Sequence, residues 1–401
     1  MHTTHIIIGS SAAGLSAATT LSRLDPQARI ICISDEPEQP YNKCFLVDYV
    51  AADRSRQELF TLRAALAEHP HFTLLLGTSV TTIDPIGMTV TLGDGQRLSY
   101  DTLFMGMGGS PFIPAVPGIS LSGVFTFYTL ADIDKIMVYT AQRAVCKAVV
   151  VGAGLSGLEC ANALHARGIA VTMIERGDHI LPHHTDRGGS DFIRKAAHQS
   201  GVAIMTNAQA HELIGQDGSI AGVLLADETL VPADLVIFTV GMRPHTGLAQ
   251  RAGIALHGHH VAVDNRLQTN IPTIFAGGDL VAAPCSLTGA LVPSTTWPDA
   301  VLQGSVAAYG MVGQTRLYPG VVGNTASHFF GFTIAACGRL QVSAERQSVV
   351  VASERAYSVF ELEEGVLKAY SLIGASPTAA MTCRRALLTQ QPISEQELRS
   401  V

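Results

Sequence analysis

The sequence predicts an α/β fold with two three-layer ββα domains, the first of them discontinuous, and a small α+β domain at the C-terminal end. One observation behind this prediction is that a strand, a glycine-rich turn, a helix and a second strand follow one another twice, at residues 5–33 and 148–174. The other is length, since 401 residues exceed what one hydrophobic core normally organises. We therefore expect two or three domains.

The clearer of the two motifs begins with a β-branched strand, Val149–Val151, which leads directly into the turn Gly152-Ala-Gly154-Leu-Ser-Gly157 and then a helix. In such a turn the first glycine bends the chain, the second lets the backbone approach a pyrophosphate, and the third lets the helix pack closely on the strand. The pyrophosphate lies at the helix N-terminus. The predicted contacts of this dinucleotide site are Gly152, Gly154, Leu155, Ser156 and Gly157.

The next strand, residues 170–174, ends at Glu175. A carboxylate about 20 residues beyond the glycine turn can accept hydrogen bonds from the 2′-hydroxyl of an adenosine ribose. Because the same carboxylate repels a 2′-phosphate, we expect NADH to be preferred over NADPH. Arg176, which follows directly, is a further predicted contact.

The second motif lies at the start of the chain. A strand at His5–Ile8 is followed by Gly9-Ser-Ser-Ala-Ala-Gly14, a helix over residues 15–24 and a strand at Arg29–Ile33. Ser11 replaces the middle glycine and is small enough to permit a close backbone approach. Two Rossmann-like units in one chain predict two dinucleotides, FAD and NAD, that exchange a hydride. The predicted contacts here are Gly9, Ser11, Ala13 and Gly14.

Composition excludes several classes of partner. The chain is 47% hydrophobic and 15% charged, as in a well-buried globular protein, and its formal charge of −7 is spread without blocks. Nucleic acid and acidic membrane surfaces are therefore not expected partners. There is no apolar run of about 18 residues and no basic leader at the N-terminus, so we expect a soluble, cytoplasmic protein. The seven cysteines form no CxxC pair and no metal-ligand cluster, and no metal site is predicted.

Together these motifs resemble the pyridine nucleotide-disulfide oxidoreductase superfamily over nearly the whole chain, and within it the NADH:rubredoxin reductase and nitrite-reductase flavin-module branch. The family's acidic strand end followed by Pro-Tyr-x-Arg is similar to residues 34–43, SDEPEQPYNK. Lys43 replaces the arginine, so a cation at the flavin is kept and the bidentate fork is lost. The resemblance implies that either Asp35 or Glu36 binds the FAD ribose, and spacing alone does not choose between them.

The remainder of the first domain contains strands at residues 73–80 and 88–92, with turns at 84–87 and 93–95. Gly106-Met107-Gly108 resembles the family's Ala-Thr-Gly turn, with methionine in place of the hydroxyl-bearing threonine. The resemblance implies cofactor contacts at Val80, Met107 and Gly108. Prolines at 111, 114 and 117, followed by Gly118, predict a linker to the second domain.

The chain is expected to return to the first domain after a strand at residues 235–240 and the turn Gly241-Met-Arg-Pro, which resembles the family's exit from the NAD domain. Gly241 is a predicted cofactor contact. The segment TIFAGGD, residues 273–279, resembles the signature of that return. It implies that Gly278 and Asp279 bind FAD, with Asp279 on the ribityl chain. The predicted FAD domain is residues 1–115 and 245–322, and the predicted NAD domain is 116–244.

Trp297-Pro298-Asp-Ala300 resembles the Trp-Pro-Asn-Ala of the nitrite-reductase-like branch and opens a helix predicted over residues 299–310. The N-terminus of this helix can stabilise negative charge on a reduced flavin. Trp297 is either a packing anchor or a wall beside flavin or nicotinamide, and Pro298 and Ala300 are further predicted cofactor contacts. Residues 324–338 resemble the start of that branch's C-terminal interface domain, and strands at 357–362 and 367–372 and a helix at 377–388 complete a domain, 323–401, for dimerisation or acceptor docking.

The sequence leaves the identity of the electron acceptor open. In similar enzymes a glutamate at the position of Glu159 contacts nicotinamide or the flavin N5 region; alternatively Glu159 only complements the helix dipole. Cys44, directly after Lys43, matches the redox cysteine of coenzyme A-disulfide reductases and NADH oxidases, and a neighbouring cation favours its thiolate. Bulky Phe45 and the absence of a histidine at Ala12 count against that role. Three classes remain: a reductase of an electron carrier such as rubredoxin, ferredoxin or a metal centre, a Cys44-dependent reductase of disulfide, persulfide or oxygen, and a flavin-bound redox-sensing interaction protein.

Overall fold

The computed structural model describes residues 3–338, 340 and 346–399. The chain forms two compact units, each assembled from separate segments. The first contains Met1–Cys44, Arg56–Ser110 and Met242–Val322, and the second contains Phe45–Ser55, Pro111–Gly241 and Gly323–Val401.

The first unit is built on a five-stranded parallel sheet in the order β20-β7-β1-β2-β3. Its central strands are runs of buried Ile, Leu and Phe, as strands covered on both faces require. The central strand β1 pairs in register with β2 on one side and β7 on the other. The strands are β1 Thr4–Ile8, β2 Arg29–Ile33, β3 Phe72–Leu75, β7 Thr102–Met105 and β20 Ile274–Ala276.

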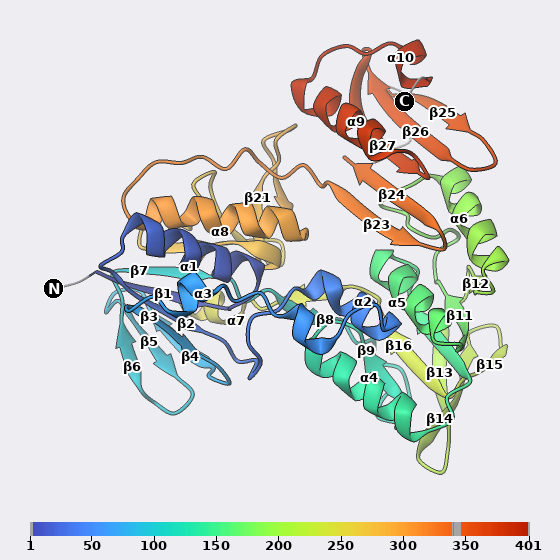
Figure 1. Cartoon of the computed structure of the whole chain (residues 1–401), viewed down its shortest axis with the longest axis horizontal. Coiled ribbons are helices and arrows are strands. Elements are labelled where there is room, and N and C mark those ends of the chain that lie inside the picture. Colours follow the sequence, from blue (N-terminus) through green and yellow to red (C-terminus); the bar gives the residue numbers. More distant parts are fainter. Residues whose placement is uncertain (1–2, 339, 341–345, 400–401) are drawn as a thin grey trace. The chain divides into compact units, whose positions relative to one another are not determined.

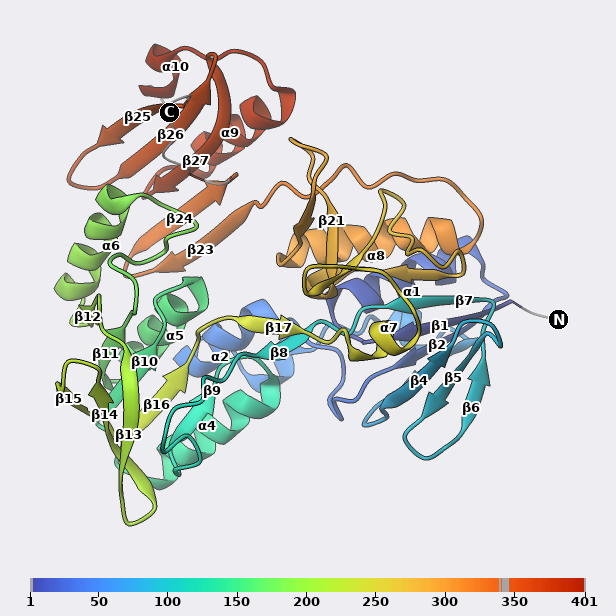
Figure 2. The same cartoon turned by 180° about the vertical axis from the view of Figure 1, so that it is seen from behind.

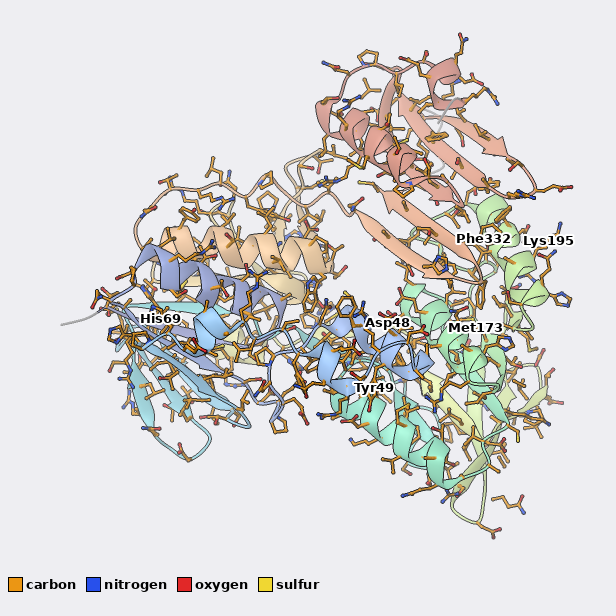
Figure 3. The ribbon with its side chains drawn as sticks, viewed as in Figure 1. Asp48, Tyr49, His69, Met173, Lys195 and Phe332 are labelled. Atoms are coloured by element: carbon orange, nitrogen blue, oxygen red, sulfur yellow. The ribbon has the colours of Figure 1, made fainter. Side chains whose placement is uncertain are left out.

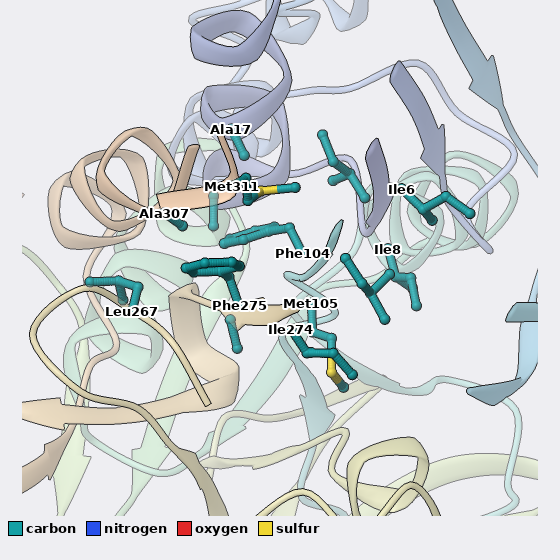
Figure 4. Packing of buried hydrophobic residues seen from close by; sticks show 14 of the residues in the cluster. Ile6, Ile8, Ala17, Phe104, Met105, Leu267, Ile274, Phe275, Ala307 and Met311 are labelled. Atoms are coloured by element: carbon teal, nitrogen blue, oxygen red, sulfur yellow. The ribbon is translucent and has the colours of Figure 1, made fainter. Parts of the chain in front are cut away.

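Two helices cover one face of this sheet, and an antiparallel sheet covers the other (Figures 1 and 2). The helices are α1 Ala12–Leu24 and α8 Trp297–Met311. They touch so closely that a β-carbon added at Gly304 would overlap the carbonyl oxygen of Ala13. The antiparallel strands are β4 Val80–Asp84, β5 Thr89–Leu92 and β6 Arg97–Ser99. Figure 4 shows the core between helices and sheet, where Phe104, Phe275 and Met311 pack together.

The three ββα layers are as predicted, but two strand predictions were wrong. The strand predicted at residues 235–240 ends at Phe238. Residues 73–80 do not form a single strand, because Gly77, with φ +60°, turns the chain between β3 and β4. The first of these strands joins the parallel sheet and the second joins the antiparallel one. The unit also contains α3 Ala64–Ala67, α7 Gly247–Arg251 and a mixed sheet of β18 Leu256–His257, β19 His260–Ala262, β21 Val281–Pro284 and β22 Leu291–Pro293.

The second unit repeats this plan. Its parallel sheet has the order β12-β11-β10-β16-β9, and an antiparallel sheet of β13, β14 and β15 contributes apolar side chains to the same core. The parallel strands are β9 Val124–Thr126, β10 Lys147–Val151, β11 Ala170–Ile174, β12 Ala203–Met205 and β16 Leu235–Phe238. The other elements are α2 Leu46–Ala51, α4 Leu130–Gln142, α5 Leu155–Ala166, α6 Arg187–Gln199, β13 Ala210–Gln216, β14 Ser219–Leu225 and β15 Leu230–Pro232.

The C-terminal segment adds an antiparallel sheet to the second unit, in the order β23-β24-β27-β26-β25. The strands predicted at 357–362 and 367–372 and the helix predicted at 377–388 are confirmed within one residue at each end. The elements are β23 Thr325–Phe329, β24 Phe332–Cys337, β25 Gln347–Ala352, β26 Tyr357–Glu363, β27 Val366–Ile373, α9 Pro377–Thr389 and α10 Glu395–Arg399. Phe192 of α6 packs edge-on against Phe332 of β24, with ring centroids 5.1 Å apart.

Two short strands, β8 Gly109–Pro111 and β17 Met242–Pro244, pair with each other. They lie at two of the places where the chain passes from one unit to the other. Residues 45–55 belong to the second unit, whereas the sequence predicted that they are part of the FAD domain. The assignment of FAD, NAD and interface domains to these segments stays a prediction. Within the described part of the chain, no helix is both long and apolar enough to cross a membrane.

Candidate functional site

The turn between β10 and α5 has the geometry that its three glycines predict. Gly152 has φ +104°, which an L side chain rarely adopts, and its amide donates to the carbonyl of Ile174 at 2.8 Å. A β-carbon at Gly157 would overlap the carbonyl oxygen of Gly152. The hydroxyl of Thr239 donates to the carbonyls of Val151 (3.0 Å) and Gly152 (3.1 Å) and so fixes the turn from the end of the neighbouring strand.

The middle glycine, Gly154, differs from the other two in conformation and packing, and this difference tests whether the turn suits a dinucleotide. Gly154 is the N-cap of α5 with φ −79°, a conformation open to any residue, and a β-carbon there would meet no described atom within 4 Å. Neither backbone conformation nor protein packing therefore requires glycine at this position. A pyrophosphate at the start of α5 supplies the missing reason, because the first amides of a helix attract an anion that must approach the backbone. The cradle fits the predicted group.

Glu175 closes the turn from the end of β11. Its carboxylate accepts from the amide of Ala153 at 2.9 Å and from the amide of Gly177 at 2.7 Å. Both oxygens are thereby oriented by the backbone, and each keeps capacity to accept from a ribose hydroxyl. Arg176 is exposed, and Leu155 and Ser156 form the first turn of α5.

The turn between β1 and α1 reproduces this geometry. Gly9 has φ +102°, its amide donates to the carbonyl of Ile33 at 2.7 Å, and a β-carbon at Gly14 would overlap the carbonyl oxygen of Gly9. Ser11 takes the place of Gly154: it is the N-cap of α1, with φ −83°, and its side chain makes no capping hydrogen bond. A dinucleotide cradle is thus present in each unit.

The two candidate ribose acids have different surroundings. Because Ile33 and Ile174 hold equivalent positions, the residue that corresponds to Glu175 is Ser34, and Asp35 and Glu36 lie one and two residues further on. Asp35 is exposed, whereas Glu36 accepts from the hydroxyl of Tyr41 at 2.6 Å and pairs with Lys43 at 3.3 Å. Lys43 also lies 5.9 Å from the centre of the Tyr41 ring. The positive charge beside Cys44 is therefore shared with a carboxylate.

The return segment places three predicted cofactor residues together. A β-carbon at Gly278 would lie 3.4 Å from that of Ala13 and 3.8 Å from that of Ala300, which come from the short turn after β20, from α1 and from α8. Gln303, a fully buried residue of α8, accepts from the amide of Gly278 at 2.7 Å and donates to the hydroxyl of Ser294 at 2.8 Å. Asp279 follows directly in this turn.

Helix α8 begins at Trp297, two residues earlier than predicted. The hydroxyl of Thr296 accepts from the amide of Asp299 at 3.3 Å as an N-cap, and Pro298 lies in the first turn, where no amide donor is needed. The hydroxyl of Tyr318 donates to the carboxylate of Asp299 at 3.1 Å. The burial of Tyr318 and the negative charge of Asp299 raise the pKa of Tyr318. Trp297 is half-buried and packs against the core of the unit.

The other predicted contacts lie at separate points of the two units. Met107 and Gly108 are held by His245, whose ring nitrogen lies 3.2 Å from the carbonyl of Met107 and whose amide donates to Gly108 at 2.9 Å. Val80 begins β4, three residues after Gly77, whose amide donates to the carbonyl of Glu36 at 3.1 Å. Gly241 lies in the second unit, where its carbonyl accepts from the amide of Phe112.

Cys44 and Glu159 have contrasting environments. Cys44 is exposed in a short 3-10 turn, Lys43–Phe45, and its amide donates to the side chain of Asn42 at 2.9 Å. Glu159 is the fifth residue of α5, just beyond the first helical turn, and its side chain is half-buried. Burial, with a smaller contribution from Asp48, raises the pKa of Glu159.

Two dinucleotide cradles, each on its own parallel sheet, define a two-nucleotide oxidoreductase fold, and the comparisons with known proteins agree. The model of the family described as pyridine nucleotide-disulphide oxidoreductase matches residues 3–304, and the chain belongs to this family. The family is FAD- and NAD(P)H-dependent, and the chain is an NAD(P)H-dependent flavin oxidoreductase.

Similar proteins differ in the acceptor that their names state. The chain is 30% identical to the NADH oxidase of Methanocaldococcus jannaschii, with 88% of this chain and 79% of that protein covered. It is 30% identical to the probable ferredoxin reductase CtmF of Castellaniella defragrans, with 98% and 95% covered. The structure of the NAD-dependent persulfide reductase from A. fulgidus matches with a TM-score of 0.91 and 26% identity, over 97% of this chain and 77% of that one.

Sequence reasoning missed the residues that hold the cradles from outside. Gln303 and Thr239 act on the glycine turns through side chains, and neither belongs to a glycine motif. A glutamine among the apolar residues of α8 was the one available signal, since a buried amide needs partners. Thr239 follows an apolar strand and gave no such signal.

The open space at Gly154 makes a selective test possible. In Gly154→Val the new side chain meets no protein atom but occupies the predicted pyrophosphate position, so NADH affinity should fall more than about tenfold while FAD stays bound and the fold stays intact. Stopped-flow reduction of the flavin by NADH measures the effect, and the melting temperature serves as the control. An unchanged reduction rate would refute the site.

Proposed function

We propose that this chain is an NADH-dependent flavoprotein reductase that passes electrons from NADH through FAD to an electron-carrier protein such as a ferredoxin or rubredoxin. The observation that carries the two-cofactor part is the repeated cradle: Gly9 and Gly152, and Gly14 and Gly157, have matching conformations and contacts. When bound, the flavin accepts a hydride from NADH and releases electrons to the acceptor.

In this proposal the residues of the chain bind NADH and FAD and orient them toward each other. The N-terminus of α5 and Glu175 hold the NADH pyrophosphate and ribose, and the N-terminus of α1 and one of Asp35 or Glu36 hold those of FAD. Gln303 fixes the turn that presents Gly278 and Asp279 to the flavin side. Glu159 is proposed to accept a hydrogen bond at the nicotinamide end, and the capped N-terminus of α8 to stabilise negative charge at the flavin.

Two observations favour a carrier protein as acceptor. The probable ferredoxin reductase CtmF is 30% identical to this chain over 98% of its residues, whereas the persulfide reductase structure is 26% identical. The ammonium group of Lys43 is paired with Glu36, which reduces its effect on the Cys44 thiol. A Cys44-dependent reductase is the second candidate, favoured by the exposure of Cys44 next to that cation.

The acceptor proposal predicts how fast the reduced flavin is reoxidised. Stopped-flow mixing of NADH-reduced enzyme with a [2Fe–2S] ferredoxin or a rubredoxin should reoxidise the flavin at least about tenfold faster than air-saturated buffer does. Cys44→Ser should retain the carrier rate, because no thiol step is needed. Reoxidation no faster than in air would overturn the carrier proposal, and loss of the carrier rate in Cys44→Ser would favour the thiol class.

The preference for NADH rests on the charge of Glu175. Its carboxylate is held by two backbone amides, so it cannot easily move away from a 2′-phosphate. Glu175→Gln keeps the size and one acceptor but removes the charge, and should lower the NADH/NADPH ratio of kcat/KM by about tenfold. Asp178→Asn is the matched control, because Asp178 is a nearby acid already paired with Arg187 and His179. An unchanged ratio in Glu175→Gln would contradict the preference.

A further inference from the structure

Helix α5, which begins at the proposed pyrophosphate site, is joined by two hydrogen bonds to β23, the first strand of the C-terminal sheet, and to the turn that follows it. The hydroxyl of Ser327 on β23 donates to the carboxylate of Glu159 at 2.5 Å. The amide of Phe330 donates to the side chain of Asn162 at 3.1 Å. Because Glu159 and Asn162 are three residues apart, they lie on one face of the helix. The C-terminal sheet therefore contacts this helix through two separate polar links.

Helix α2 also contacts α5; it follows the Lys43–Phe45 turn and carries Asp48 and Tyr49, which are labelled in Figure 3. Arg167, at the end of α5, donates to the carbonyl of Val50 at 3.1 Å. Asp48 of α2 acts on Glu159 as a like charge, and its own carboxylate pairs with Arg54 at 2.9 Å. Glu159 therefore has a hydroxyl donor on β23 in direct contact and the negative charge of α2 in its surroundings.

These neighbours act on Glu159 in opposite directions. Burial raises the pKa of Glu159 most, because a charged carboxyl loses solvation, and Asp48 adds repulsion. The hydroxyl of Ser327 stabilises the ionised form and lowers the pKa. No basic side chain is among the described groups that shift the pKa of Glu159, on α2, on β23 or on α5 itself. The Ser327 hydroxyl is the one described contact that favours the carboxylate.

We propose that Ser327 is a positioning residue for NAD(P)H: its hydroxyl holds the carboxylate of Glu159 in place and keeps it ionised, so that it can accept a hydrogen bond from the nicotinamide carboxamide. This inference rests on the proposed function, in which Glu159 lies at the nicotinamide end. Ser327 lies beyond residue 304, where the family match ends. The C-terminal sheet therefore supplies part of the NAD(P)H site, in addition to any docking role.

The positioning role is separable from simple attachment of the sheet. Asn162 accepts from the backbone amide of Phe330, in the turn after β23, and does not touch Glu159 in the contacts described. Asn162→Ala therefore weakens the attachment and leaves the carboxylate unchanged. Ser327→Ala removes the donor to Glu159, and Ser327→Thr restores a hydroxyl on a residue that suits a strand.

The experiment measures the affinity of the oxidised, FAD-containing enzyme for NAD⁺ by calorimetry from pH 4 to 9, which requires no turnover. Affinity in the wild type is expected to decrease as the pH falls through the pKa of Glu159, because the protonated carboxyl accepts poorly. In Ser327→Ala this step should move upward by about one pH unit, the size of one hydrogen bond to a charged group. Ser327→Thr and Asn162→Ala should keep the step at the wild-type pH, and Glu159→Gln should remove it.

The outcomes distinguish the inference from the proposed function. A wild type without a pH step, or a step at the same pH in Ser327→Ala and wild type, overturns the positioning role while NAD⁺ binding itself stands. An upward shift in Asn162→Ala equal to that in Ser327→Ala also overturns it, because attachment would then explain both. A wild-type holoenzyme that does not bind NAD⁺ at any pH overturns the proposed function together with the inference.

Discussion

The structure depends on one steric constraint that occurs in both units: the third glycine of each turn lies against the carbonyl of the first. Gly14 on Gly9, and Gly157 on Gly152, leave no space for a β-carbon. This contact brings the N-terminus of each helix directly over the carboxyl end of the central strand of its sheet. The first amides at that N-terminus then face the proposed pyrophosphate position. Everything else in the two sites is arranged around these two helix ends.

The discontinuity of the first unit follows from the same requirement. Helix α1 needs a partner that can approach its backbone, and α8 provides one through Gly304, from a segment almost three hundred residues later. The strand β20 that precedes α8 completes the parallel sheet beside β7. The buried amide of Gln303 then couples α8 to the Gly278 turn, so the returning segment contributes both sheet closure and site geometry.

The sequence predicted the layers, the two cradles and most strand boundaries because these depend on local patterns, such as β-branched runs and glycine spacing. It failed where a contact joins residues far apart in the sequence, or where a turn has no distinctive turn sequence. Gly77 makes a turn inside a predicted strand. The sequence did not reveal this turn, because an isolated glycine among apolar residues is as typical of a β-bulge within a strand as of a turn. The bond between Glu159 and Ser327 spans 168 residues, and no local pattern encodes it. For the same reason the choice between Asp35 and Glu36 was left open, since it depends on side chains such as Tyr41 and Lys43 rather than on spacing.

The central claim is that two cofactors bind and that electrons leave through the flavin rather than through a cysteine. An anaerobic titration of the oxidised enzyme with NADH, followed by flavin absorbance, tests it most directly. The account predicts one FAD per chain and complete reduction by one NADH per flavin, without a long-wavelength thiolate-to-flavin band. A requirement for two NADH per flavin would contradict it, because the second electron pair would then reduce an oxidised form of Cys44, such as a sulfenic acid or a mixed disulfide. The appearance of that band would also contradict it, because it would place the Cys44 thiolate against the flavin.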